Sequence, residues 1–169
     1  MLGVLHNMLA DTIEQWTYLA VFILAAIPWV ELIAVIPLGI LINLNPWWVA
    51  ILGFVGNWLT VMLLVVFFQR FRQWRERKAK GSEETKRGRR AHKIWDRYGV
   101  VGLSLLGPLI IGSHITAAVA LGFKASIKQV SVWMTISLAV WSAAAAIVAY
   151  FGLDTFGLIR TDFFEGRGL

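Results

Sequence analysis

The 169-residue sequence contains no cysteine, few charged residues and only four prolines. Without cysteine, the chain has no disulfide framework, no thiolate metal site and no cysteine nucleophile. Charged residues make up 15% of the chain, whereas soluble proteins average about 25%. Apolar residues make up 58%, and the mean hydropathy is +0.68. A soluble domain of this length has too little interior for so much apolar side chain, so the composition predicts an integral membrane protein and excludes a disordered one.

Most of the positive charge lies in one segment. Residues 70–97 contain twelve Lys or Arg and four Asp or Glu, a net charge of +8. Basic segments occur in nucleic-acid-binding proteins. In an apolar chain they are also typical of cytoplasmic loops, because Lys and Arg resist translocation. We adopt the second interpretation and expect this loop to contact anionic lipid headgroups rather than nucleic acid.

Two uncharged runs, residues 47–68 and 130–151, are each 22 residues long. As helices they would measure about 33 Å, enough to cross a hydrocarbon core of about 30 Å. The second run is rich in Ala and Ser, which permits close helix packing in lipid. We expect this run to mediate a homodimer or a larger homo-oligomer. Near the N-terminus, apolar residues recur at helical spacing and predict an amphipathic interfacial helix over residues 1–15.

Two further apolar segments, residues 16–44 and 99–123, are interrupted by helix-breaking residues. Two full crossings joined by a turn need about 40 residues, so each segment is either one crossing or a re-entrant hairpin. A hairpin over 99–123 keeps Lys124 and Lys128 on the cytoplasmic side, which the positive-inside rule favours. The residues expected to break the hairpins into half-helices are Pro37, Gly39, Pro108 and Gly112.

The segments combine into one predicted architecture, an all-α integral membrane protein. In it, a re-entrant hairpin followed by a transmembrane helix occurs twice with opposite orientation, after the N-terminal amphipathic helix. Inverted repeats with broken helices are an architecture of secondary transporters. The expected parts of this single membrane domain are the interfacial helix 1–15, the first repeat 16–69, the basic loop 70–97, the second repeat 98–152 and the tail 153–169.

Three polar residues within the apolar segments are candidates for binding a substrate or an ion. Glu31 is the only formally charged side chain in these segments, and a carboxylate at membrane depth is costly enough to indicate a function such as proton coupling. The alternative is a solvated Glu31 near the outer interface. Asn57 is either a binding residue or a helix–helix hydrogen-bonding group. His114 is either a proton relay or a structural histidine.

Several chemical signatures are missing from the sequence. The three histidines are scattered along the chain, no phosphate-binding Gly-Lys-Ser/Thr loop is present, and no pair of carboxylates lies within the apolar segments. We therefore expect no metal site, no cofactor and no enzymatic activity.

The motifs resemble those of a known family. Glu31-Leu-Ile-Ala-Val-Ile-Pro37-Leu-Gly39, then Gly56-Asn57, then Pro108 with a Gly-rich turn and Ala-Leu-Gly-Phe123 resemble the small multi-drug export proteins of bacteria and archaea, over roughly residues 27–152. The resemblance implies drug efflux by a multi-pass protein of the prokaryotic inner membrane. The layout is also similar to the DedA family, which implies facing re-entrant hairpins and movement of polyprenyl phosphate or other lipids. The arginines of that family's second hairpin have no counterpart in residues 99–123.

These observations lead to three hypotheses. The first is a secondary transporter, coupled to protons or to sodium, that moves a small hydrophobic or cationic substrate competing with the proton for Glu31. The second is a lipid translocase or scramblase of the DedA type, acting on a polyprenyl phosphate. The third is a non-transporting membrane protein whose basic loop recruits a partner. The sequence leaves the substrate and the coupling ion undefined.

Overall fold

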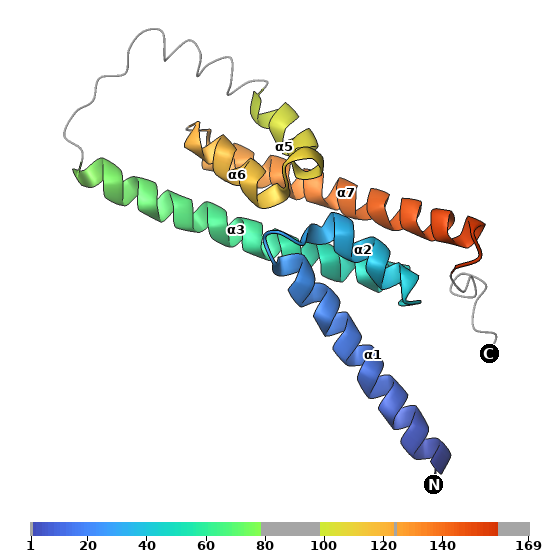
Figure 1. Ribbon diagram of the computed structural model, residues 1–169. Coiled ribbons are helices and arrows are strands. Elements are labelled where there is room, and N and C mark those ends of the chain that lie inside the picture. Colours follow the sequence, from blue (N-terminus) through green and yellow to red (C-terminus); the bar gives the residue numbers. More distant parts are fainter. Residues whose placement is uncertain (1, 79–98, 124, 159–169) are drawn as a thin grey trace. The chain divides into compact units, whose positions relative to one another are not determined.

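The structure is a computed structural model that describes residues 2–78, 99–123 and 125–158. These residues form six helices and no strand (Figure 1). The helices are α1 (Leu2–Ala26), α2 (Glu31–Leu41), α3 (Pro46–Lys78), α5 (Val100–Ile110), α6 (Ser113–Gly122) and α7 (Ile127–Thr155). The prediction of an all-helical chain is confirmed for this part of the molecule. Most of the predicted basic loop, residues 79–97, and the end of the tail lie outside the described residues.

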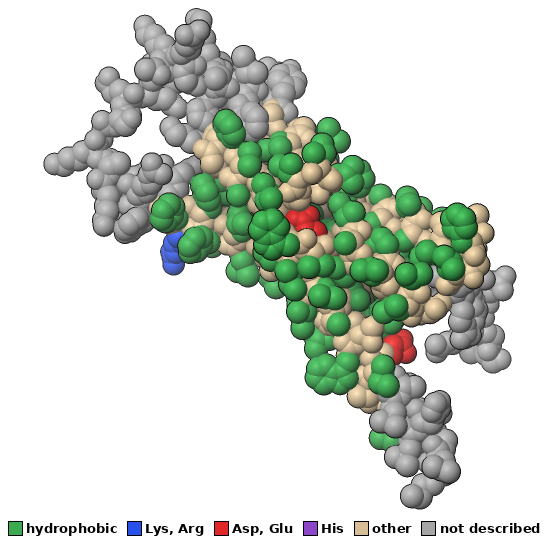
Figure 2. Space-filling model, viewed as in Figure 1, with side chains coloured by type: hydrophobic (Ala, Val, Ile, Leu, Met, Phe, Trp, Pro, Cys, Tyr) green, Lys and Arg blue, Asp and Glu red, His purple; other side chains and the backbone are tan. Residues whose placement is uncertain are grey.

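Two helices are long and apolar enough to cross a membrane. They are the Pro46–Phe71 part of α3 and the whole of α7, Ile127–Thr155. Both predicted spans are therefore confirmed as helices, each with a few more residues than expected at its ends. Hydrophobic side chains are spread over the whole described surface in view, and charged side chains appear only at isolated points (Figure 2). Such a surface suits contact with lipid, because exposing so much apolar surface to water would be costly.

The chain forms two compact units, and each long helix contributes to both. Unit 1 consists of residues 1–57 and 140–169, and unit 2 consists of residues 58–139. Unit 1 holds the paired helices α1 and α2 together with the first part of α3 and the second part of α7. Unit 2 holds the paired helices α5 and α6 with the remaining parts of α3 and α7.

The first helix is longer than the predicted interfacial helix. Helix α1 continues without interruption from Leu2 to Ala26, so no boundary separates residue 15 from residue 16. The sequence offers no Pro in this range, and its first proline is Pro28. A proline disfavours the helical conformation of the residue before it, here Ile27, which accounts for the end of α1 at Ala26.

Three of the four residues predicted to break the hairpins lie within helices instead. Helix α2 continues through Pro37 and Gly39, and α5 continues through Pro108. Each proline loses one backbone hydrogen bond, but ending the helix would leave several backbone groups unpaired in apolar surroundings, which costs more. The first break instead lies at residues 27–30, between α1 and α2.

Gly112 is the one predicted break residue that lies between two helices. Its φ of +90° falls in a region that side chains with a Cβ rarely adopt. The N–H groups of Ile111 and Gly112 both donate to the Gly107 carbonyl, at 2.8 and 3.1 Å, which closes the end of α5. A methyl group at Gly107 would collide with the side chain of Thr116 on α6. The glycine pair therefore lets α5 turn and α6 pack closely against it.

The start of α3 is set by local hydrogen bonding. The backbone N–H of Trp47 donates to Asn45 Oδ1 at 3.0 Å, so Asn45 caps the helix and Pro46 takes the first helical position, where its missing N–H costs nothing. The N–H of Asn45 donates to the Tyr18 hydroxyl at 3.0 Å, which ties this cap to α1. Asn43 ends α2 in the left-handed conformation, with φ of +63°.

Candidate functional site

Glu31 lies at the break between α1 and α2, in an unfavourable backbone conformation. Its φ is +50°, in the left-handed region that Gly and Asn tolerate but that costs other residues about 1–2 kcal/mol. Its N–H donates to the Ile27 carbonyl at 3.4 Å, as the N–H of Val30 does at 3.1 Å. The side chain is half-buried. A carboxylate here has two costs, the strain of its backbone and the partial loss of its solvation. Residues with strained backbone conformations cluster at functional sites.

Contacts of three glycines fix the level of Glu31 along α3. A methyl group at Gly39 would lie 2.8 Å from Val49, and one at Gly53 would lie 2.8 Å from Ile36. Residue 39 of α2 thus lies beside residue 49 of α3, and residue 36 of α2 lies beside residue 53 of α3. The two helices therefore run antiparallel. A methyl group at Gly56 would meet the backbone carbonyl of Phe22, near the end of α1. The break and Glu31 therefore lie near the level of Gly56, about 15 Å along α3 from Pro46.

Asn57 follows Gly56 on α3 and is fully buried in unit 1. It belongs to the same unit as Glu31 and lies at nearly the same level along α3. About two helical turns before Asn57, the Ser142 hydroxyl of α7 donates to the Ala50 carbonyl at 2.8 Å. A polar side chain of unit 1 thus links α7 to α3.

His114 lies in unit 2, so the structure does not place it in one unit with Glu31 and Asn57. It is the second residue of α6, and only 5% of it is exposed. Its Nε2 lies 2.9 Å from Thr60 Oγ1 on α3, and its Nδ1 lies 3.2 Å from Ser113 Oγ. The role of Thr60 was not evident from the sequence. The one available signal is that Thr60 is a polar residue one helical turn after Asn57 in an otherwise apolar run.

Other polar groups of unit 2 also lie in its interior. The Trp58 indole N–H donates to Thr135 Oγ1 at 2.9 Å, and the Thr116 hydroxyl donates to the Gly112 carbonyl at 2.7 Å. Ser104 is fully buried, and its hydroxyl has no hydrogen-bond partner. Apart from Ser104, these groups bind one another or the backbone. Among the described residues, no three His, Asp or Glu lie close enough to hold a metal ion.

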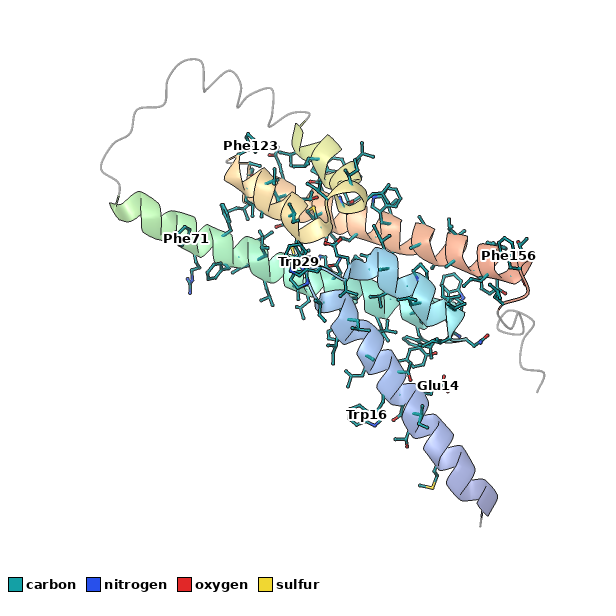
Figure 3. The ribbon with its side chains drawn as sticks, viewed as in Figure 1. Glu14, Trp16, Trp29, Phe71, Phe123 and Phe156 are labelled. Atoms are coloured by element: carbon teal, nitrogen blue, oxygen red, sulfur yellow. The ribbon has the colours of Figure 1, made fainter. Side chains whose placement is uncertain are left out.

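The charged side chains are divided by sign between the two units. Among the side chains that the structure describes, those of unit 1 are all acidic and those of unit 2 are all basic. Glu14 and Trp16 project from opposite sides of α1 (Figure 3). The full set is Glu14, Glu31 and Asp154 in unit 1, and Arg70 and Lys128 in unit 2.

The two long apolar helices and the apolar surface are typical of a helical membrane protein. A family model described as "Putative small multi-drug export protein" matches residues 31–144, about two thirds of the chain, and the protein belongs to that family. The match begins at Glu31 and includes Asn57 and His114. The resemblance noted from the sequence motifs is thereby confirmed. No curated protein and no solved structure matches the chain.

The strain at Glu31 can be measured by comparing Glu31→Gly with Glu31→Ala. Both variants remove the carboxylate, so their difference isolates the cost of a Cβ in the left-handed conformation. We expect the Gly variant to be more stable by about 1 kcal/mol, which raises the melting temperature in detergent by about 2–4 °C. Ala34, exposed on the same helix, is the control: there Ala34→Gly should destabilise by about 0.5–1 kcal/mol. Equal stability of the two Glu31 variants would contradict the strain.

Proposed function

We propose that the protein is a proton-coupled secondary transporter that exports a small hydrophobic or cationic molecule. Membership of an export family supports transport, and the observation that carries the coupling is the position of Glu31. The chain retains a half-buried carboxylate in a strained conformation, at a helix break, where Gly or Asn would cost less. A carboxyl group there can hold either a proton or a cationic substrate, but not both together.

The depth of Glu31 supports the same role. The candidate membrane span of α3 is Pro46–Phe71, and the level of Glu31 lies about 15 Å from Pro46. If Pro46 lies at the outer membrane surface, Glu31 lies near the middle of a hydrocarbon core about 30 Å thick. In this arrangement α1 and α2 form a re-entrant hairpin whose break carries the carboxylate to the midplane, where secondary transporters bind their substrates.

The distribution of charge supports an orientation. The basic side chains Arg70 and Lys128 belong to the cytoplasmic side, and the acidic side chains Glu14 and Asp154 belong to the outer side. Both α5–α6 and α1–α2 then enter the membrane and return to the side from which they came. The protein is thus proposed to be a multi-pass protein of the prokaryotic inner membrane, with the basic loop in the cytoplasm.

The membrane arrangement predicts the labelling of single cysteines, which the cysteine-free chain makes simple to introduce. In sealed inner-membrane vesicles, Arg70→Cys and Lys128→Cys should react with a membrane-impermeant maleimide from the same face. Asp154→Cys should react only from the opposite face. If residues 99–123 cross the membrane once instead, the labels at positions 70 and 128 will appear on opposite faces, and the hairpin is excluded.

The function is tested in proteoliposomes with tetraphenylphosphonium as a probe for a hydrophobic cation. An imposed pH gradient should drive its accumulation, and dissipating the gradient with a proton ionophore should release it. A sodium gradient at constant pH is the matched control and should drive none. Failure of a pH gradient to drive any cation in a panel of several would overturn proton-coupled export.

A lipid translocase is the second candidate, favoured by the presence of two helix–break–helix pairs, α1–α2 and α5–α6. An anionic lipid substrate is less favoured, because α5 and α6 carry no Lys or Arg that could bind its phosphate. The two candidates separate in one preparation, because a translocase moves a fluorescent polyprenyl phosphate between leaflets without a pH gradient. Leaflet exchange above that of protein-free vesicles, together with no cation transport, would favour the translocase.

A further inference from the structure

The N-terminal half of α1 exposes all of its described side chains. We call residues 2–16 the α1 arm; it is continuous with the part of α1 that pairs with α2 (Figure 1). The described side chains of the arm are those of residues 8 and 12–16, and they cover every side of the helix. Three are large and apolar, with exposed fractions of 61% for Met8, 66% for Ile13 and 66% for Trp16. A helix of about 15 residues is marginal alone in water, so the arm needs a partner.

Helix α1 has two opposite faces. Tyr18, Val21 and Ala25 recur every three or four residues and are buried or half-buried against their own unit. The opposite face is exposed, and its described residues are Thr12, Trp16, Leu19 and Ile23. The same division extends into the arm, where Glu14 and Trp16 project from opposite sides of the helix (Figure 3). One face of α1 therefore packs within its own unit, and the other face is left for a partner.

The exposed face has the spacing of a coiled coil. Its residues are four, three and four positions apart, as the a and d positions of a heptad repeat are. The sequence continues the same spacing toward the N-terminus with three leucines. The full series of a and d positions is Leu2, Leu5, Leu9, Thr12, Trp16, Leu19 and Ile23. Such a seam fits a second helix that runs alongside, because a strict seven-residue repeat keeps facing the same partner along its whole length.

A lipid surface suits the arm poorly. Helices that lie on a membrane hold anionic headgroups with Lys and Arg, but α1 contains neither, and its charged residues are Asp11 and Glu14. Residues 4–26 also contain no Pro, Gly or Ser, the residues typical of helix kinks. The Tyr18 hydroxyl accepts from the N–H of Asn45, just before the start of α3. The straight arm therefore extends past that level, which in the proposed membrane arrangement is the outer surface.

A second copy of the chain fits the arm. Two copies in one membrane share one orientation, so their arms leave it on the same side and run parallel. In a parallel coiled coil, the e and g positions flank the seam, and Met8 at g then faces the partner's Ile13 at e. The e and g residues of the arm carry no Lys, Arg, Asp or Glu; they are His6, Met8, Ile13 and Gln15. The two acids fall at c and f positions, so identical arms meet without like charges.

From these observations we propose that the α1 arms of two copies pair as a parallel coiled coil and make the protein a homodimer. The inference uses the proposed membrane arrangement, but it does not depend on the substrate or on proton coupling. It assigns self-association to the exposed face of α1. The sequence alone favours a different interface, the Ala- and Ser-rich residues 130–151, so the two interfaces can be tested against each other.

Disulfide formation between single cysteines in native membranes tests the pairing. In a parallel coiled coil, the two copies of residue 12 face each other, and the two copies of residue 14 lie on the far sides. Oxidation with copper phenanthroline should therefore convert Thr12→Cys into a covalent dimer. Glu14→Cys should stay monomeric, because cysteines whose Cα atoms are more than about 7 Å apart cannot be bridged. Val148→Cys, exposed on α7, probes the other interface and should also stay monomeric.

The mass of the purified protein in detergent, measured by light scattering, is an independent test. The wild-type chain should be a dimer. Thr12→Glu places two like charges at one d position of the seam and should halve the mass of the protein in the particle. Glu14→Lys also changes a charge in the arm, but it does so at an f position away from the seam, and it should leave the dimer intact.

The possible outcomes separate the α1 interface from its alternatives. A disulfide in Val148→Cys but not in Thr12→Cys would place the contact on α7 and overturn the proposal. A disulfide product of Thr12→Cys that contains a different protein would identify another partner and overturn it as well. A monomer by light scattering, with no disulfide at any of the three positions, would exclude self-association. Neither measurement depends on transport, so failure of the proposed function would leave the pairing of the arms in place.

Discussion

Replacing Glu31 by Gln is expected to abolish export driven by a pH gradient. Gln keeps the size of the side chain and remains neutral, so it mimics the protonated carboxyl group but cannot release a proton. The rate of tetraphenylphosphonium accumulation driven by a pH gradient in proteoliposomes should fall by about 100-fold or more. The melting temperature of the Glu31→Gln variant should stay close to that of the wild-type protein, because Gln has nearly the same size and shape as Glu.

Asp154→Asn is the matched control for this substitution. Asp154 is also an acidic residue of unit 1, but it is exposed near the end of α7. Removing its charge should leave the pH-driven rate unchanged. Accumulation by Glu31→Gln at the wild-type rate would contradict the proposed role of Glu31, and an equal loss in Asp154→Asn would mean that surface charge, rather than Glu31, controls transport.

The largest effect on stability is expected from Gly56→Ala. The added methyl group would meet the Phe22 carbonyl, a backbone atom that cannot move away without shifting α1. Overpacking of this kind costs about 1–3 kcal/mol, and at about 2–4 °C per kcal/mol the melting temperature in detergent should drop accordingly. Transport should fall as well, because the shift of α1 displaces the break that carries Glu31.

Gly152→Ala on α7 provides the comparison. Gly152 also lies in a long helix of unit 1, but a methyl group there would meet nothing within 4 Å. The higher helix propensity of Ala should therefore raise stability by about 0.5–1 kcal/mol. If Gly56→Ala also stabilises the protein, the close approach of α1 to α3 is wrong, and with it the inferred level of Glu31.

The transmembrane helices could be predicted from the sequence because their signal is local. Uncharged runs of 22 residues leave few alternatives, so both were found, although α3 continues to Lys78 and α7 begins at Ile127. The breaks were predicted less well. Proline alone is a weak criterion, since apolar surroundings favour continuing a helix through Pro37 or Pro108 over exposing several backbone groups. Gly112 differs because the turn requires a positive φ.

The candidate residues were found from the sequence, but their environments were not. Glu31 stood out because a lone carboxylate in an apolar segment is costly, yet nothing in the sequence indicates its left-handed backbone. His114 was identified without Thr60, its partner 54 positions away, because a single sequence does not show which helix faces meet. The division of Glu31 and His114 between two units likewise depends on tertiary packing.

The most direct test of the central claim is proton release on substrate binding by purified protein in weakly buffered detergent solution. If the proton and the substrate compete for Glu31, adding tetraphenylphosphonium at a pH where the carboxyl group is protonated should release protons in proportion to the substrate bound. Glu31→Gln should release none, and Asp154→Asn should release as much as the wild-type protein. Binding of the cation without proton release by the wild-type protein, or equal release by Glu31→Gln, would contradict the account.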